Sequence, residues 1–287
     1  MIETHPSLSA LPRLVSEPLV RAALAEDLGR AGDLTTDAIV PDGASARAAI
    51  VARRDGVLAG LEVALLAFTL LDPSMRMTRA RRDGEAIARG ETVATLEGSA
   101  RALLSGERTA LNILCRLCGI ASATRRLVDA VAGYRATVVD TRKTTPGLRS
   151  LEKYAVRAGG GGNHRFGLDD AVLIKDNHVA FAGGVREAVA RARAGVGHLV
   201  KIELEVDTLD QVREARDLPI DAILLDNMPP DTMREAIAIL EGRFITEASG
   251  SVTAETIVPI AASGVDLISV GWLTHSVTAL DLGLDFL

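Results

Sequence analysis

The sequence predicts an α/β protein with two parts, a small α+β domain followed by a closed or nearly closed α/β barrel. From residue 136 onward, six short apolar runs alternate with helical segments within about 140 residues, as parallel βα units do. The first hundred residues mix strand and helix patterns without such a repeat. No GxGxxG fingerprint decides between the barrel and a doubly wound open sheet, so the open sheet stays an alternative.

The first hundred residues supply the elements of the small domain. Residues 1–20 are punctuated by Pro and Ser and are expected to be a lead-in, and residues 18–28 have helical spacing that ends at Gly29. In residues 26–41 the carboxylates and hydroxyls fit turn chemistry, so a loop is the favoured interpretation. Strands are expected at residues 46–53, 75–82 and 91–97, and a helix within residues 56–71.

Residues 101–132 form the junction between the two parts. Their apolar side chains recur at helical spacing on both sides of Gly119, which predicts two helices or one long interrupted helix. Glu107 and Arg108 fall near its start, where periodicity alone makes them a local surface pair. Cys115 and Cys118 form a CxxC. No second CxxC or paired histidines accompany it, so we interpret both as core cysteines.

The barrel would be built from short apolar strands joined to helices by right-handed crossovers. The strands are expected at residues 136–139, 171–174, 199–204, 222–225, 244–246 and 266–270. The helices are expected at residues 148–158, 185–194, 209–216, 231–241 and 254–263.

Composition and charge narrow the functional class. The chain has 287 residues, of which 48% are hydrophobic and 24% charged, as is ordinary for a globular protein. Its net charge of −6 argues against general binding of nucleic acid. Two cysteines cannot build a disulfide framework, and the N-terminus lacks a basic segment followed by an apolar one, so we expect a cytoplasmic protein without a signal peptide. The longest apolar run, residues 61–71, is too short to span a bilayer.

Polar residues follow every one of the six expected barrel strands. Parallel α/β folds place their active sites at the carboxyl ends of the strands, because the βα loops and helix N-termini converge there. Six such coincidences argue against helix caps and surface charges alone. The residues concerned are Asp140, Thr141, Arg142 and Lys143; Lys175, Asp176, Asn177 and His178; Glu205 and Asp207; Asp226 and Asn227; Ser249, Gly250 and Ser251; and Gly271 with His275.

These strand ends differ in chemistry. The first two are cationic, with His164 and Arg165 between them, and suit a ligand with carboxylates, since Arg holds a planar carboxylate through two parallel hydrogen bonds. The next two bring Glu205 and Asp226, which suit either Mg²⁺ or a developing cation. The last two join small residues to the start of a helix, where backbone N–H groups bind phosphate. The pattern indicates phosphoryl or phosphoribosyl chemistry on a small acid.

Residues 140–179 concentrate the basic side chains of this otherwise acidic chain. The stretch holds seven Lys or Arg and five Asp or Glu residues, which gives it a charge of +2. Its glycine run at residues 159–162 is expected to end the preceding helix and let the backbone turn toward His164 and Arg165. A cationic, glycine-rich segment in an acidic protein indicates a site for a small anion.

Residues 140–178, DTRKTTPGLRSLEKYAVRAGGGGNHRFGLDDAVLIKDNH, resemble the signature of the quinolinate phosphoribosyltransferases (nicotinate-nucleotide pyrophosphorylases, carboxylating). Supporting segments occur in the family's order and cover nearly the whole chain. They are EDLGRAGDLTTDAIVP, GERTALNIL, ELEVD, LLDN, EASGS and VGWLTHS.

The resemblance implies an N-terminal α/β sandwich domain joined to an incomplete, seven-stranded α/β (TIM-like) barrel. It implies that quinolinate and phosphoribosyl pyrophosphate react to give nicotinate mononucleotide, pyrophosphate and CO₂ in NAD biosynthesis, with Mg²⁺ on the pyrophosphate. It also implies a homodimer in which one subunit's N-terminal domain covers the other's barrel mouth, and it leaves higher oligomers open. The domains expected on this basis are residues 1–117 and 118–275, with residues 276–287 packing back onto the first. No nucleic acid or membrane partner is expected.

The same resemblance implies roles for individual residues. Lys143, Glu205 and Asp226 are the expected catalytic residues: Lys143 contacts phosphoribosyl pyrophosphate, and the two carboxylates bind its ribose and the Mg²⁺. The helical pattern alone makes Arg108 an ordinary surface residue. The resemblance instead implies that it binds the quinolinate in the partner subunit's site. The other expected substrate ligands are Arg142, His164, Arg165 and Lys175 for the quinolinate carboxylates, and Ser249, Gly250 and Gly271, with His275 nearby, for phosphate.

One position departs from the family, and three other functions stay open. The family usually has SGG where this chain has Ser249-Gly250-Ser251, and a positive φ at Ser251 would cost about 1 kcal/mol. A related phosphoribosyltransferase acting on another acid is the first alternative, although nicotinate, with one carboxylate fewer, would not need so many cations. A catalytically inactive binding protein is the second, and it would be expected to lose Lys143 or the two carboxylates. An aldolase-like barrel with Lys175 as a Schiff-base amine is the third, and the neighbouring Asp176 disfavours it.

Overall fold

The computed structural model describes residues 8–287, and the chain divides into two compact units. Unit 1 combines the chain up to Arg125 with Thr144–Gly160 and Leu273–Leu287, and unit 2 combines Arg126–Lys143 with Gly161–Trp272. The first seven residues, on which part of the expected lead-in falls, lie outside the described residues. The domain boundary expected at residues 117/118 falls inside one long helix. No helix of the described chain is both long and apolar enough to cross a membrane.

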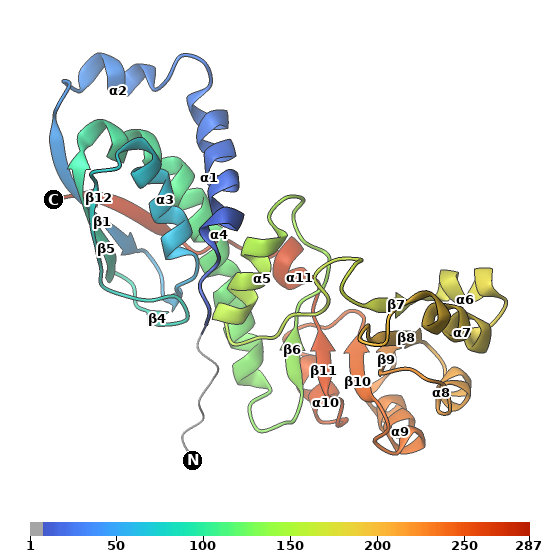
Figure 1. Cartoon of the computed structure of the whole chain (residues 1–287). Helices are drawn as coiled ribbons and strands as arrows, with labels where there is room; N and C mark the ends of the chain where they lie inside the picture. Colours follow the sequence, from blue (N-terminus) through green and yellow to red (C-terminus); the bar gives the residue numbers. More distant parts are fainter. Residues whose placement is uncertain (1–7) are drawn as a thin grey trace. The chain divides into compact units, whose positions relative to one another are not determined.

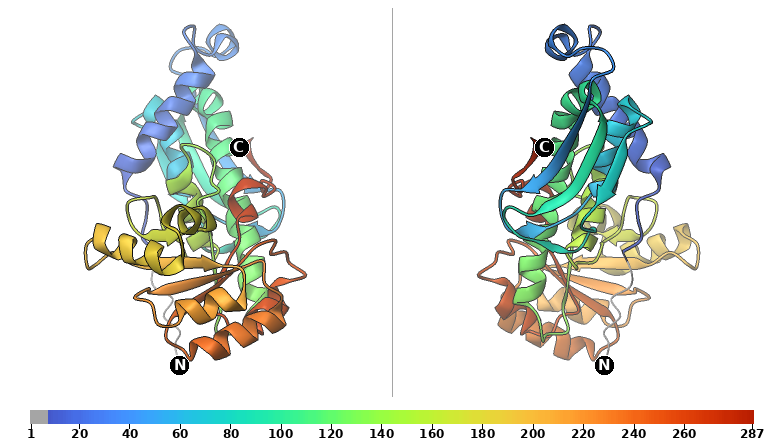
Figure 2. Two further views of the ribbon diagram at one scale, coloured as in Figure 1. Left: turned by 90° about the vertical axis from the view of Figure 1, so that its right-hand side faces the viewer. Right: turned by 90° about the vertical axis from the view of Figure 1, so that its left-hand side faces the viewer.

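Unit 1 is built on a four-stranded antiparallel sheet in the order β12-β1-β5-β3. The right-hand view in Figure 2 faces this sheet. The C-terminal strand β12 (Leu282–Phe286) pairs with β1 along its length, from Ala48 opposite Phe286 to Ala52 opposite Leu282. The strands expected in the first hundred residues are confirmed as β1 (Ser45–Ala52), β3 (Arg76–Arg79) and β5 (Thr92–Ser99), and two short strands, β2 (Gly56–Val57) and β4 (Ala86–Ile87), form a separate pair.

Helices α3 (Leu61–Leu71) and α5 (Arg149–Ala158) contribute to the apolar core of unit 1 together with the sheet. Phe68 of α3, Ile50 of β1 and Val156 of α5 are completely buried in this core. Two N-terminal expectations need correction. Helix α1 (Arg13–Leu28) begins five residues before the expected start and contains Pro18, which has no N–H to donate but does not end the helix. The expected loop contains the short helix α2 (Leu34–Ile39), whose first turn Asp33 caps by accepting a hydrogen bond from Thr36 N at 3.0 Å.

The junction is one continuous helix, α4 (Ala100–Ala130), so the interruption expected at Gly119 is wrong. A glycine is required at this position because the backbone of the C-terminal segment packs directly against the helix. A Cβ at this position would lie 2.4 Å from the carbonyl oxygen of Thr278 and 3.0 Å from Cα of Ala279. The glycine therefore makes room for backbone and does not end the helix.

Replacing Gly119 with Ala is expected to destabilise the fold although Ala is the better helix former. The gain in helix propensity is about 1 kcal/mol, whereas overpacking against backbone, which cannot rotate away, costs about 1–3 kcal/mol. The cost of the clash should exceed the gain in helix propensity, so urea unfolding should show a lower free energy of unfolding for Gly119→Ala than for the native protein. Gly195, at the end of helix α7 (Val185–Gly195), has no atom within 4 Å of a built Cβ, so Gly195→Ala is the control that should lose nothing. An equally stable Gly119→Ala protein would contradict this account.

Unit 2 contains a six-stranded parallel sheet in the order β6-β11-β10-β9-β8-β7 (Figure 1). Strands β7 to β11 are adjacent in chain order, and the first strand, β6, closes onto the last, β11. This circular order is that of a barrel, because a doubly wound sheet would reverse its strand order near the middle. The gap lies between β6 and β7, where a single parallel bridge joins Val139 to Gly162. The expected incomplete α/β barrel is thereby confirmed as the fold class, with six strands in the sheet where seven were expected.

The strands and helices of unit 2 follow the alternation of apolar runs and helical patterns. The strands are β6 (Thr137–Val139), β7 (Val172–Ile174), β8 (Ile202–Val206), β9 (Ala222–Asp226), β10 (Ile245–Ser249) and β11 (Leu267–Ser269). The remaining helices are α6 (Asp176–Ala182), α8 (Leu209–Ala215), α9 (Pro230–Leu240), α10 (Ile257–Ala261) and α11 (Trp272–His275), the last of which spans the boundary between the units. Helix α6 was not expected, and β8 begins three residues later than predicted.

Candidate active site

A pocket of about 480 Å³ opens at the carboxyl ends of the unit 2 strands. Every residue that lines it belongs to unit 2, and nine of them were expected as site residues. These are Arg142, Lys143, His164, Arg165, Lys175, Glu205, Asp226, Ser249 and Gly250. The lining also includes Thr141, Leu173, Leu224, Asn227, Glu247, Ser251 and Ser269.

The period-two alternation of the strands directs polar side chains into this pocket. In β8 the residues Ile202, Leu204 and Val206 are buried, while the alternate Glu203 and Glu205 are partly exposed. In β9 and β10, Asp226 lies in register with Ser249. Because side chains two apart point the same way, each strand brings a polar group to the inner face near its carboxyl end.

The cationic side of the pocket brings two arginines together. Burial, and then the charge of Arg142, lower the pKa of Arg165 below its ordinary value. The buried Nε of Arg142 has no hydrogen-bond partner among the described residues. Two positive charges held close together in a partly buried place repel each other when no anion is bound. An anion between them would offset this repulsion. The arrangement is therefore suited to a carboxylate.

Asp140, at the end of β6, fixes the segment that carries His164 and Arg165. Its side chain is fully buried; one oxygen accepts the backbone N–H of His164 at 2.9 Å and the other accepts Asn163 Nδ2 at 2.6 Å. These bonds cross the gap in the barrel at the place where Gly162 bridges to Val139. The expected turn after the glycine run is thus held by a carboxylate of the preceding strand.

Lysines occupy two further edges of the pocket. Lys175 forms an ion pair with Glu205, with Nζ 2.5 Å from Oε2. Lys143 lies beside Gly271, where a built Cβ would come within 2.8 Å of Lys143 Cδ. A side chain at Gly271 would therefore displace the lysine, which gives that glycine a reason apart from phosphate binding.

The acidic side of the pocket fits the expected Mg²⁺ in its chemistry. Glu205 and Asp226 come from neighbouring strands and offer only carboxylate oxygens, which are hard ligands. Mg²⁺ usually takes one or two carboxylates and completes its shell with water and substrate phosphate, so a preformed cage of protein ligands is not required. The side chains now make other contacts: Glu205 pairs with Lys175, and Asp226 accepts a hydrogen bond from Asn227 Nδ2 at 2.7 Å.

The loop after β10 adopts the left-handed backbone conformation at two successive residues. Gly250 has a φ of 98° and Ser251 a φ of 46°. Ser251 thus does adopt the positive φ that was considered from the sequence. A Cβ at Gly250 would lie 2.1 Å from Oδ1 of Asn227 and 2.9 Å from its backbone nitrogen, so the loop and the end of β9 are packed against each other.

The phosphate role that the resemblance implies for this loop predicts that Gly250→Ala loses phosphate binding, because the added methyl group combines a left-handed strain of about 1–2 kcal/mol with a clash against Asn227. The control is Gly242→Ala, where φ is 71° and no atom lies within 4 Å of the built Cβ. Both variants carry the strain, and only the first displaces pocket residues. Phosphoribosyl pyrophosphate binding by calorimetry should be lost in Gly250→Ala and retained in Gly242→Ala. Equal binding by the two variants would contradict a phosphate role for this loop.

Three expected site residues, Arg108, Gly271 and His275, are not among the residues that line this pocket. Arg108 is an exposed residue of α4, and His275 is an exposed residue whose Nδ1 lies 2.5 Å from Ser276 Oγ; both belong to unit 1. Gly271 belongs to unit 2 and reaches the pocket through its contact with Lys143. Glu247 and Ser269 line the pocket but were not singled out. Alternation would have found Glu247, because it lies two residues before Ser249 on the same strand face.

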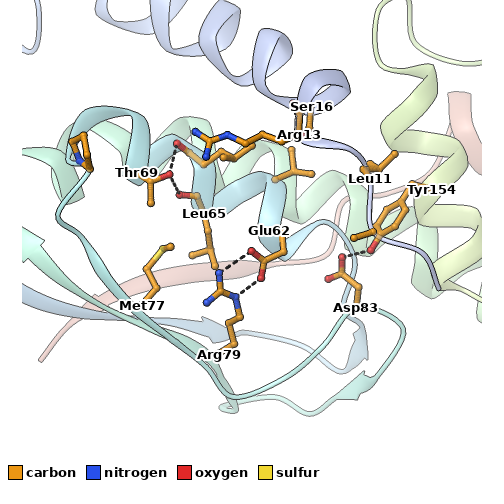
Figure 3. Close-up of a pocket in the computed structure, with 14 residues that line it drawn as sticks. Leu11, Arg13, Ser16, Glu62, Leu65, Thr69, Met77, Arg79, Asp83 and Tyr154 are labelled. Carbon is orange, nitrogen blue, oxygen red and sulfur yellow. Dashed lines mark hydrogen bonds and ion pairs between the residues drawn. The ribbon is translucent and has the colours of Figure 1, made fainter. Parts of the chain in front are cut away.

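A second hollow, of about 500 Å³, lies within unit 1 (Figure 3). Arg79 forms an ion pair with Glu62 there, and Asp83 accepts a hydrogen bond from Tyr154 at 2.6 Å. Arg79 thus already has an anionic partner, whereas in the unit 2 pocket two arginines repel each other.

The CxxC residues remain core cysteines, as expected. Cys118 is completely buried and Cys115 partly so, and both are free thiols. Burial raises the pKa of each thiol, which disfavours the thiolate needed for redox or metal chemistry.

The fold and the pocket define an α/β barrel protein with a pocket lined by basic and acidic side chains at the carboxyl ends of its parallel strands. The chain belongs to the quinolinate phosphoribosyl transferase family, whose N-terminal domain matches residues 33–118 and whose C-terminal domain matches residues 120–285. It is 48% identical to the probable nicotinate-nucleotide pyrophosphorylase [carboxylating] of Bacillus subtilis over 91% of this chain and 89% of that protein. It is 45% identical to the nicotinate-nucleotide pyrophosphorylase [carboxylating] of Mycobacterium leprae over 93% and 95% of the two chains.

Solved structures agree with this assignment. The fold matches NadC from Streptococcus pyogenes with a TM-score of 0.93 at 42% identity, covering 97% of this chain and 99% of that one. It matches the nicotinate-nucleotide pyrophosphorylase of Francisella tularensis with the same TM-score at 36% identity, covering 98% and 99%. The human nicotinic acid phosphoribosyltransferase shares the fold alone, with a TM-score of 0.58 at 13% identity over 97% of this chain and 74% of that one. The resemblance inferred from the sequence is confirmed.

Proposed function

We propose that this protein transfers the phosphoribosyl group of phosphoribosyl pyrophosphate to quinolinate with loss of CO₂, giving nicotinate mononucleotide and pyrophosphate for NAD biosynthesis. The observation that carries the proposal is the division of the unit 2 pocket into a cationic side with Arg142 and Arg165 and an acidic side with Glu205 and Asp226. The relatives' names supply the reaction, and the pocket supplies groups of the right charge for each part of the two substrates.

The cationic side would bind the dicarboxylate. Arg142 and Arg165 hold one carboxylate through parallel N–H···O bonds, and their mutual repulsion is relieved when the anion arrives. Lys175 leaves Glu205 and contacts the second carboxylate. This exchange makes the lysine–glutamate pair a resting arrangement that substrate binding opens. His164, held between Asp140 and Arg165 by its backbone and ring, closes the inner end.

The acidic side would bind the sugar and the metal. The pyridine nitrogen attacks the anomeric carbon while pyrophosphate leaves, and Glu205 stabilises the positive charge that builds on the ribose ring. Mg²⁺ held by Glu205 and Asp226 would supply charge neutralisation to the pyrophosphate. Lys143 and the N–H groups of the Ser249–Gly250 turn contact phosphate oxygens. The ring nitrogen is then positively charged. It makes loss of CO₂ from the neighbouring ring carbon feasible, because it stabilises the electron pair that remains on that carbon when CO₂ departs.

The proposal includes a cytoplasmic homodimer with a shared site. Arg108 is exposed on α4 of unit 1 and does not line the pocket of unit 2. The family resemblance assigns it to the site of a second subunit, where it would add another cation to the carboxylate side. His275 is placed near phosphate on the same basis.

The direct test is a product balance. The purified protein is supplied with quinolinate, phosphoribosyl pyrophosphate and Mg²⁺, and nicotinate mononucleotide, CO₂ and pyrophosphate are quantified together. We expect the three products in equal amounts, and none with the Lys143→Ala protein. Pyrophosphate release without CO₂, or no product at all, would contradict the proposal.

A further inference from the structure

The inner end of the pocket contains a histidine and two glutamates that lie close together. The proposed reaction does not explain why they form a group. His164 Nε2 lies 3.1 Å from Glu203 Oε2 and 3.6 Å from Glu247 Oε1. Glu247 is 1% exposed, and neither of its carboxylate oxygens has a hydrogen-bond partner in the described part of the chain. The hydroxyl of Ser269, which also lines the pocket, is directed to the carbonyl oxygen of Ala248 at 3.4 Å.

An ionised carboxylate in such a place would be strongly unfavourable, because it has lost water without gaining donors. Three species are able to compensate it: a charged imidazolium, a bound metal cation or a proton. The three residues are close enough to ligate a metal, since their nearest ligand atoms lie within 4.8 Å of one another. The protonation of His164 decides among the three.

The hydrogen bond at Nδ1 favours the neutral ring of His164, with its proton on Nε2. The backbone N–H of Arg165 donates to Nδ1 at 2.7 Å, so Nδ1 carries no proton. This acceptor role of Nδ1 disfavours an imidazolium, which has both nitrogens protonated. Metal ligation through Nε2 is disfavoured as well, because a metal-bound neutral imidazole keeps its proton on the other nitrogen. The Nε2–H instead donates to Glu203, the closer carboxylate.

We propose that Glu247 is a neutral carboxylic acid beneath the substrate pocket, so that it and Glu203 together carry one negative charge, and that it acts as a positioning residue for His164 and Arg165. Glu247 does not touch substrate, since its oxygens are buried. It fills the space behind the His164 ring and keeps a second negative charge away from a pocket that must receive anions. This inference deepens the proposed function and rests on it for its effect on quinolinate.

The surroundings of Glu247 favour the neutral form. Burial, followed by the charge of Glu203, raises the pKa of Glu247 from 4.5 to about 7; His164 and the hydroxyl of Ser269 oppose the rise, and Asp140 on β6 adds to it. Glu247 pairs in register with Leu224 on β9 and with Leu267 on β11. Neither paired residue carries a positive charge that could compensate an ionised Glu247.

The test compares the native enzyme with Glu247→Gln, which keeps the shape and cannot ionise. In the native enzyme KM for quinolinate should rise severalfold as pH increases from 6 to 8.5, because Glu247 then becomes charged. In Glu247→Gln it should stay flat over the same pH range. The control is Glu241→Gln, an exposed glutamate that pairs with Arg216, and it should show the native pH profile. A native pH profile in Glu247→Gln would overturn the proposal.

A second measurement needs no substrate and separates this inference from the proposed function. Since the folded-state pKa of Glu247 is raised, the native fold should lose stability relative to Glu247→Gln as pH rises from about 4.5 through about 7. The two proteins should unfold at equal urea concentrations at pH 4.5 and at different ones at pH 8.5. Infrared spectroscopy of the native protein should show a carboxylic acid C=O band that disappears through pH 7, which keeps the test valid if the variant fails to fold. A stoichiometric divalent metal that is lost in Glu247→Gln, or the absence of that band at pH 6, would refute it.

Discussion

Mixing an Arg108→Ala subunit with an Arg142→Ala subunit should restore activity that neither variant has alone. Removing either arginine from a buried carboxylate contact costs about 2–5 kcal/mol, so each variant alone should lose at least about 30-fold in kcat/KM. Arg142 lines the pocket of unit 2, whereas Arg108 lies in unit 1 and is expected to serve the second subunit. In a heterodimer one site then keeps both arginines.

The expected recovery is quantitative. Random reassociation of equal amounts gives about half heterodimers with one intact site each, or about one quarter of the native activity. The matched control mixes Arg142→Ala with Arg165→Ala. Both residues line the same pocket, so every site stays damaged and no activity should return. If subunits exchange and the Arg108→Ala/Arg142→Ala mixture still regains no activity, the site is not shared between subunits.

Replacing Asp226 with Asn should remove the effect of Mg²⁺ on phosphoribosyl pyrophosphate binding. The change keeps the shape of the side chain and its ability to accept a hydrogen bond, but it deletes the negative charge that a divalent cation requires. We expect kcat/KM to fall by at least about 100-fold, equivalent to about 2.7 kcal/mol of transition-state stabilisation.

Calorimetry gives the measurement that separates a metal role from a structural one. Native protein should bind phosphoribosyl pyrophosphate more tightly with Mg²⁺ than without it, and Asp226→Asn should bind equally in both conditions. Asp210→Asn is the control, because Asp210 is an exposed residue paired with Arg213 and should behave as native. An undiminished Mg²⁺ effect in Asp226→Asn would place the metal elsewhere.

The sequence predicted the barrel well because its strands are short apolar runs and each ends in a polar group. The carboxyl ends of parallel strands meet at one edge, so Arg142, Lys175, Glu205 and Asp226 converge on one pocket without any tertiary information. The α4 helix was harder, because Gly119 lowers helix propensity whether it breaks the helix or admits the C-terminal backbone. Local pattern alone does not reveal that contact.

The inner end of the pocket escaped prediction for a related reason. Glu247 sits in the middle of a strand, and its significance depends on two residues far away in the chain, His164 and Glu203. Helix α6 was missed because seven residues give too little periodicity, and its start is fixed by a local contact in which Lys175 N–H donates to His178 Nδ1 at 2.9 Å. His178, counted with the polar strand end, is thereby a helix-capping residue.

The choice between quinolinate and nicotinate tests the account most directly, because the cationic side of the pocket is explained only by a dicarboxylate. Both acids are offered separately with phosphoribosyl pyrophosphate and Mg²⁺, and kcat/KM is measured for each. We expect a preference for quinolinate of at least about 1,000-fold, since nicotinate leaves some of the pocket's cationic groups without an anionic partner. Comparable kcat/KM values for the two acids would contradict the assignment of these arginines and lysines to two carboxylates.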